Sequence, residues 1–274
     1  MTLTVKAFMQ IQILLGRIGV FILGPAYFLF IRMMGYRVRD LKDLRETCDQ
    51  AFREHRGPWI ICANHLTMVD SMILTYAMLS LFRHLTNFRS IPWNLPERDN
   101  FQRNPILAVL CYLAKCIPVN RGGSREEMRK TLDKCDYVLS LGQNILIFPE
   151  GGRSRTGRVN REGYSYGVGR FVREFEQCRV MCIYLRGDGQ HTFGSLPRFG
   201  ERFTMKIEVF TPQRSEVSGL RAQREYAGQI VGRLAEMEED YFASSGKRCD
   251  RPYGSREGRK EPGCPVHQPR LHVR

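Results

Sequence analysis

Short, uninterrupted runs of hydrophobic residues recur along the middle of the chain. They occupy residues 59–63, 145–148 and 180–185, whereas residues 203–209 alternate between apolar and polar positions. A continuous apolar run of this length is typical of a strand buried on both faces, and alternation is typical of a half-buried strand. The pattern therefore predicts four strands, and the apolar residues of 117–119 predict a fifth, very short one.

Segments with helical periodicity separate these strands. Ser124 is followed three residues later by Glu127, a capping-box pattern, and the helix that it starts should end at Gly142. Strands that alternate with helices predict an α/β fold, with a mixed, largely parallel sheet flanked by helices. The expected helices cover residues 40–56, 71–81, 106–114, 124–142 and 220–241.

The first 39 residues have the character of a membrane-associated helical segment. Residues 18–31 carry no charge, and Arg17 and Arg32 flank them. This run is shorter than the roughly 20 residues that a spanning helix needs, and Pro25 interrupts it. We therefore expect a pair of short helices in one leaflet at the cytoplasmic face of a membrane. A single transmembrane helix and a buried soluble helix are the alternatives.

The rest of the chain divides into a globular part and a tail. Residues 40–245 contain all the predicted strands and no linker, which indicates one domain. Residues 246–274 are rich in glycine, proline and charge, and we expect them to form a disordered basic tail.

The chain is strongly basic, with 42 Lys and Arg against 28 Asp and Glu, a net charge of +14. Such a surplus favours an anionic partner, either nucleic acid, an acidic membrane surface or a phosphate-bearing substrate. No zinc-finger, helix-turn-helix or RNA-binding signature supports nucleic acid as the partner. The nine cysteines form no Cys-x-x-Cys pair and no Cys/His cluster with zinc spacing, so we expect no metal.

A histidine and an aspartate flank the first predicted loop of the domain. His65 follows the strand at 59–63, and Asp70 stands five positions later at the start of a predicted helix. This spacing lets the carboxylate turn back onto one imidazole nitrogen and leaves the other nitrogen free as a base. The alternative is a helix N-cap at Asp70 and a strand-end histidine without chemistry.

Two further loops combine arginine with glycine directly after predicted strands. The chain reads Pro-Glu-Gly-Gly-Arg-Ser after residue 148 and Asn-Arg-Gly-Gly after residue 119. Glycine lets a ligand approach the backbone, a carboxylate can accept from a hydroxyl, and arginine can hold a phosphate. The ends of parallel strands meet at one edge of an α/β sheet, so we expect both loops to lie beside His65, unless they are plain surface turns. The candidate binding residues are Arg121, Glu150, Gly151, Arg153 and Ser154.

The order of these motifs resembles the lysophosphatidic acid acyltransferase family (1-acylglycerol-3-phosphate acyltransferases) over about residues 55 to 215. The resemblance implies that His65 is the base that deprotonates the acceptor hydroxyl and that Asp70 orients it. It implies that Arg121, Glu150 and Gly151 bind the glycerol phosphate. The donor would be acyl-CoA or acyl carrier protein, with no further cofactor. The product would be phosphatidic acid, made from a lysophospholipid acceptor at a membrane lipid surface.

The sequence departs from this family at several positions that concern the acceptor. Asn120 stands where the family usually has Asp, and Gly152 stands where Thr is usual. Arg98 is the only base near the position where family members often carry a phosphate-binding Lys. These differences leave other acceptors open, namely glycerol 3-phosphate, another lysophospholipid or an amino-acid-derived lysolipid.

Two other classes of protein compete with this interpretation. Residues 163–167 fit the Gly-x-Ser-x-Gly pattern of serine hydrolases, but a nucleophile at Ser165 needs a buried strand before it, and residues 158–162 are polar except for Val159. A non-catalytic, membrane-surface lipid-binding protein agrees with the composition but leaves the three loops unexplained.

Overall fold

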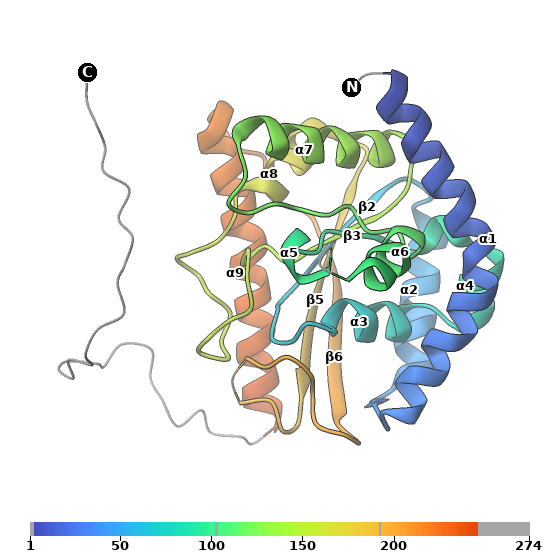
Figure 1. The fold of residues 1–274 in the computed structure, drawn as a ribbon. Helices are drawn as coiled ribbons and strands as arrows, with labels where there is room; N and C mark the ends of the chain where they lie inside the picture. The colour runs from blue at the N-terminus through green and yellow to red at the C-terminus, as the bar shows by residue number, and fades with distance from the viewer. Residues whose placement is uncertain (1–2, 102–103, 192, 246–274) are drawn as a thin grey trace, which may run out of the picture.

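Strands from most of the chain join one mixed sheet at the centre of the fold (Figure 1). The computed structural model describes residues 3–101, 104–191 and 193–245. The strands are β1 (Arg37–Val38), β2 (Trp59–Ala63), β3 (Trp93–Asn94), β4 (Ile145–Ile147), β5 (Arg179–Gly187) and β6 (Arg202–Phe210). Their order is β1-β6-β5-β2-β4-β3; only β5 and β6 pair antiparallel among these neighbours. The predicted α/β class with a largely parallel sheet is confirmed.

Helices cover both faces of the sheet. They are α1 (Leu3–Met33), α2 (Leu41–Glu54), α3 (Asp70–Met78), α4 (Leu81–Thr86), α5 (Arg98–Phe101), α6 (Pro105–Leu113), α7 (Arg125–Ser140), α8 (Gly167–Glu174), α9 (Gly219–Ser245) and the 3-10 turn Phe88–Ser90. Ile61 and Ala63 of β2 face the core under α2 and α3, whereas Ile60 and Cys62 face the core under α7, α8 and α9. The strand is apolar throughout because helices bury it on both sides.

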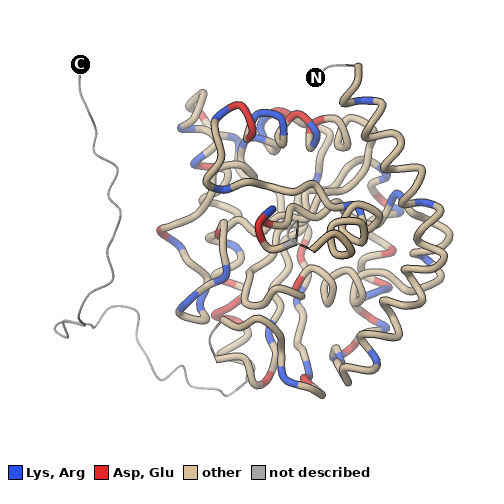
Figure 2. Tube along the Cα trace, in the orientation of Figure 1, with Lys and Arg blue, Asp and Glu red and all other residues tan. Residues whose placement is uncertain are grey.

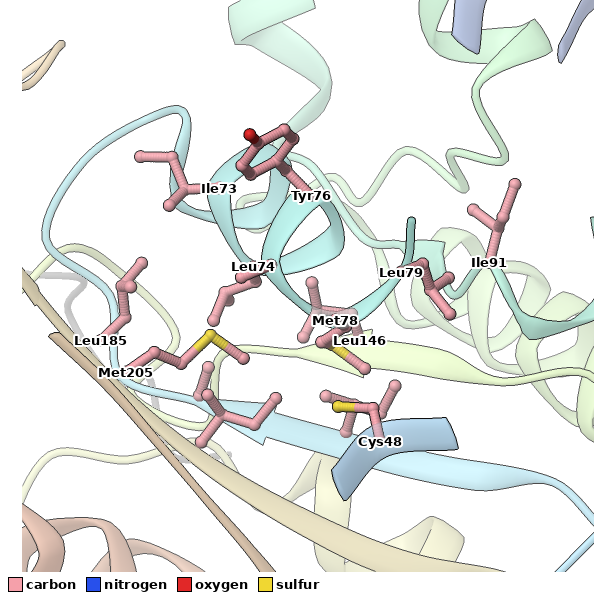
Figure 3. Close-up of a cluster of buried hydrophobic side chains, with 14 of the residues drawn as sticks. Cys48, Ile73, Leu74, Tyr76, Met78, Leu79, Ile91, Leu146, Leu185 and Met205 are labelled. Carbon is pink, nitrogen blue, oxygen red and sulfur yellow. The ribbon is translucent and has the colours of Figure 1, made fainter. Parts of the chain in front are cut away.

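The core on the side of the sheet that α2 and α3 cover fixes the position of α3, the helix that follows β2. Figure 3 shows Leu74 and Met78 of α3 directed toward Leu146 of β4 and Met205 of β6. All four side chains are at most 5% exposed, and seven of the nine residues of α3 are buried, so the helix is held firmly at the end of β2. This packing determines where Asp70, the first residue of α3, is placed.

The N-terminal helix pair was a wrong prediction, because α1 is one continuous helix of 31 residues with Pro25 inside it. Proline in a helix interior removes one hydrogen bond, at a cost of about 3 kcal/mol. A stripe of buried residues along the whole helix offsets that loss by packing against the domain. By length and composition α1 is also apolar enough to cross a membrane. The stripe consists of Met9, Gln12, Gly16, Val20, Gly24, Phe28 and Ile31.

The structure differs from two other predictions, each of which concerns a single strand or helix. Residues 117–119 form no named strand: Cys116 and Val119 make isolated bridges to Asn94 and Glu97, and Ile117 and Val119 donate to the carbonyls of Asn94 and Pro96. The helix expected over 71–81 divides at Leu79, and the Ser80 hydroxyl then caps α4. The capping box that starts α7 is confirmed. The predicted disorder of 246–274 concerns residues outside those that the structure describes.

Candidate active site

The loop after β2 begins with an asparagine that extends the sheet by its side chain. The Asn64 amide donates to the carbonyl of Leu185 at 3.0 Å and accepts from the Leu185 N–H at 2.7 Å. Asn64 is 3% exposed, so both hydrogen bonds are shielded from water. The chain therefore leaves the sheet at a fixed point, immediately before His65.

His65 and Asp70 form a hydrogen-bonded pair at this point. The two side chains meet at 3.0 Å, between Nδ1 of His65 and Oδ2 of Asp70. The same Oδ2 accepts from the backbone N–H groups of Leu66 and Thr67, at 2.6 Å and 2.7 Å. The Thr67 hydroxyl donates to the other oxygen. Asp70 is 2% exposed, so this carboxylate is rigidly held by four partners.

The imidazole of His65 keeps its second nitrogen available. Its ring stacks on Phe148 at 4.0 Å between centroids, and its side chain is 14% exposed. Asp70 accepts from Nδ1, which assigns the proton to that nitrogen and leaves Nε2 with its lone pair. No residue in the described part of the chain hydrogen-bonds to Nε2. The arrangement is that of an oriented base.

Glu150 joins the loop of His65 to the loop after β4. One of its oxygens accepts from the backbone N–H of His65 at 3.0 Å, and the other accepts from the N–H of Asn160 at 3.2 Å. Burial raises the pKa of Glu150 to about 7, against the lowering effect of these two donors. In this structure Glu150 therefore fixes the backbone at His65, and contact with an acceptor hydroxyl stays a prediction.

The raised pKa of Glu150 predicts a stability change with pH. Between about pH 4.5 and 7 the folded protein holds a proton that the unfolded chain has lost, so the free energy of unfolding should fall as pH rises through this window. The full shift corresponds to about 3 kcal/mol as an upper bound. Denaturant unfolding at several pH values should show a steeper fall in wild type than in Glu150→Gln, where the raised pKa of the buried Glu238 still contributes a slope of the same sign. Equal slopes in the two proteins would contradict it.

Arg121 reaches the loop after β4 from the segment before α7. Its Nη1 lies 3.5 Å from the position that a Cβ on Gly152 would take. Its Nε lies 2.8 Å from a Glu97 oxygen that makes no hydrogen bond, so this contact is an ion pair without linear N–H geometry. The side chains are 47% and 19% exposed. Arg121 therefore lies beside the loop after β4. The same loop contains Phe148, whose ring stacks on His65.

The other predicted binding residues mainly hold the loop together. Gly151 has a φ of 68°, a left-handed conformation that favours glycine. Arg153 donates to the carbonyl of Gly194 at 2.8 Å and lies over the ring of Phe193. The Ser154 hydroxyl donates to the carbonyl of Arg158 and closes a tight turn. Substrate contacts by these three residues stay predictions.

The serine-hydrolase pattern lacks the structure that it requires. Ser165 lies in a loop before α8, and residues 158–164 form no strand. Its backbone N–H donates to the carbonyl of Pro149, and its hydroxyl accepts from Gly167 at 3.4 Å. A nucleophile elbow places its serine at a sharp turn directly after a strand, and Ser165 is not so placed.

Sequence reasoning missed three features of this site. Asn64 was visible as a polar residue directly after a buried strand, which is a signal for a fixed strand end. The Glu97 carboxylate at Arg121 gave no signal, because the two residues meet only in space. The sequence also gave no signal that residues 193–196 lie beside the His65 loop. In the structure the carbonyl of Ser195 accepts from the Met68 N–H, and the Gly194 N–H donates to the carbonyl of Leu66.

Fold and site together define an α/β protein with a histidine–aspartate pair at the end of a central strand. A sequence model of the family described as Acyltransferase matches residues 36–186, more than half of the chain. The chain therefore belongs to the acyltransferase family, which confirms the resemblance stated above. The matched residues include His65, Asp70, Arg121 and the 148–154 loop.

A named relative supports the same class of enzyme. A segment of 99 residues is 33% identical to an N-acylphosphatidylethanolamine synthase of Arabidopsis thaliana. The match covers 34% of this chain and 32% of the relative, so it spans about a third of the relative's length.

Proposed function

We propose that this protein transfers a fatty acyl group from acyl-CoA or acyl carrier protein to the free hydroxyl of lysophosphatidic acid. The product is phosphatidic acid, and the reaction takes place at the cytoplasmic face of a membrane. The observation that carries the proposal is the 3.0 Å contact between His65 Nδ1 and the buried Asp70 carboxylate, which leaves Nε2 as a base. Membership in the acyltransferase family supports the class of reaction.

The proposed reaction needs one base and no covalent enzyme intermediate. Nε2 of His65 takes the proton of the acceptor hydroxyl while the oxygen attacks the thioester carbonyl carbon. The tetrahedral intermediate then collapses, the C–S bond breaks, and the leaving thiolate takes the proton from the His65 imidazolium, which regenerates the base. Asp70 stabilises the imidazolium that forms, because its carboxylate faces Nδ1 from a buried position.

Arg121 is the proposed phosphate contact, and it carries a prediction. Arg121→Ala should raise the KM for lysophosphatidic acid about tenfold or more, the size of a charge-assisted hydrogen bond, and change the KM for the donor much less. Initial-rate kinetics with each substrate varied in turn would measure both values. Arg129→Ala is the matched control, since Arg129 is exposed on α7. An equal rise in both KM values would argue against a phosphate contact.

A screen of acceptors with labelled acyl donor tests the proposed function directly. Wild type should convert lysophosphatidic acid in preference to glycerol 3-phosphate, lysophosphatidylcholine and phosphatidylethanolamine, and His65→Ala should lose this activity. Conversion of another acceptor with none of lysophosphatidic acid would replace the proposed substrate. Lipid binding without any transfer would favour a non-catalytic lipid-binding protein.

The amine of phosphatidylethanolamine is the second candidate acceptor. The Arabidopsis relative is named for N-acylphosphatidylethanolamine. The same base can remove a proton from an amine as it attacks the thioester, so the geometry at His65 suits both acceptors. Mass spectrometry of the labelled product separates an ester from an amide.

A further inference from the structure

A cavity of about 300 Å³ lies at the edge of the sheet opposite the candidate active site. Its lining includes Trp59, the first residue of β2, and Asn144, which directly precedes β4. His65 and Phe148 follow the other ends of these two strands. None of the candidate catalytic or substrate-binding residues, all of which the structure describes, lines the cavity. It is therefore separate from the place where we expect acyl transfer.

Four arginines line this cavity, which we call the arginine cavity. Arg53 comes from the end of α2, Arg56 from the segment before β2, Arg83 from α4 and Arg89 from the 3-10 turn. Asp49 is the only carboxylate in the described lining, so a surplus of three positive charges remains. Lys and Arg occur over the whole molecule (Figure 2), and positive charge alone therefore marks no site. These four differ because separate elements bring them around one hollow.

Two of the four guanidinium groups are held in place by the protein. Nε of Arg83 lies 3.0 Å from Oδ1 of Asp49, and Nε of Arg89 donates to the carbonyl of Gly142 at 2.7 Å. Side chains that are already ordered lose less conformational entropy when a ligand binds. One side of the arginine cavity is thus prepared for an anion.

The Arg53 and Arg56 side chains are free in the part of the chain that the structure describes, with no hydrogen bond or ion pair. His55 lies between them in the sequence and lines the same cavity, and its buried Nε2 has no hydrogen-bond partner among the described residues. The arginine cavity therefore combines free cationic groups with an unpaired polar atom. An anionic ligand would supply oxygen acceptors for the two arginines.

We propose that the arginine cavity binds a ligand with two linked phosphoryl groups, at a site separate from that of acyl transfer. The planar fork of arginine matches phosphoryl oxygens in pairs. A single phosphate monoester carries about two negative charges at most, which is too few to balance three positive charges. The volume of about 300 Å³ lies at the lower end of the range for small-molecule sites. This inference does not depend on the proposed function.

Calorimetric titration of the full chain with inorganic pyrophosphate tests the site, without acyl donor or acceptor and at physiological salt, which screens exposed charges. Wild type should bind saturably. The double variant Arg53→Gln with Arg56→Gln should bind at least tenfold more weakly, because it loses two charge-assisted contacts. Both residues are exposed, so the fold should be unchanged, and circular dichroism would verify this.

The matched control is Arg125→Gln with Arg129→Gln. Both residues are exposed on α7, neither lines the arginine cavity, and the variant loses the same charge. It should bind pyrophosphate like wild type. Equal weakening in the two double variants, or no saturable binding by wild type, would overturn the proposal.

Arg121→Ala separates this site from the phosphate contact of the proposed function, since it should bind pyrophosphate like wild type. Loss of binding in Arg121→Ala, with normal binding in the double variant of Arg53 and Arg56, would overturn the arginine cavity as a site and leave the proposed function standing. Vesicles that contain a polyprenyl diphosphate distinguish two sources of the ligand. Displacement of bound pyrophosphate by these vesicles would support a lipid headgroup, and no displacement would support a soluble diphosphate.

Discussion

Replacing His65 with alanine should lower the rate constant of acyl transfer by about 10² to 10⁴-fold, the usual size of a general-base contribution. The variant loses the Nε2 lone pair that takes the hydroxyl proton, whereas both substrates should still bind. KM for donor and acceptor should therefore change little, and the loss should appear in kcat. Single-turnover measurements with labelled acyl-CoA would isolate the chemical step from product release.

The matched control is His55→Ala. His55 precedes β2 as His65 follows it, so the two variants remove the same side chain at opposite ends of one strand. The His55 variant should keep most of its activity, allowing for some loss of stability because its ring packs on Trp59. Near-normal activity in His65→Ala would remove the proposed mechanism, although the family membership would stand.

Replacing Asp70 with asparagine should lower kcat by a similar factor, about 10² to 10⁴-fold. The amide oxygen can take the place of Oδ2, which accepts from His65 Nδ1 and from the backbone N–H groups of Leu66 and Thr67. The side chain then keeps its size and these hydrogen bonds but loses the negative charge that stabilises the imidazolium formed in the reaction.

Asparagine is preferred to alanine here because Asp70 also accepts from Leu66, Thr67 and the Thr67 hydroxyl. Alanine would leave those buried donors without a partner and confuse activity with stability. Asp43→Asn is the control, since Asp43 stands in the first turn of α2 as Asp70 does in α3, without a histidine beside it. Thermal unfolding should be followed in each variant. A normal kcat in a folded Asp70→Asn protein would contradict the dyad.

The sequence alone determined the features that depend on neighbours along the chain. The apolar runs of β2, β4 and β5 predicted buried strands, because a strand covered on both faces has no polar position. The pair of His65 and Asp70 was also predictable, since a loop of six residues between the end of β2 and the start of α3 suffices to bring the two side chains together. The capping box at Ser124 is equally local.

Only the tertiary structure decided the contacts between distant segments. Glu150 accepts from backbone N–H groups of two different loops, at His65 and Asn160, and no local pattern in the sequence indicates these contacts. Pro25 was expected to break the N-terminal helix, but packing against the domain along one stripe keeps α1 whole. Local propensity is worth a few kcal/mol at most, so burial against remote parts of the chain prevails over it.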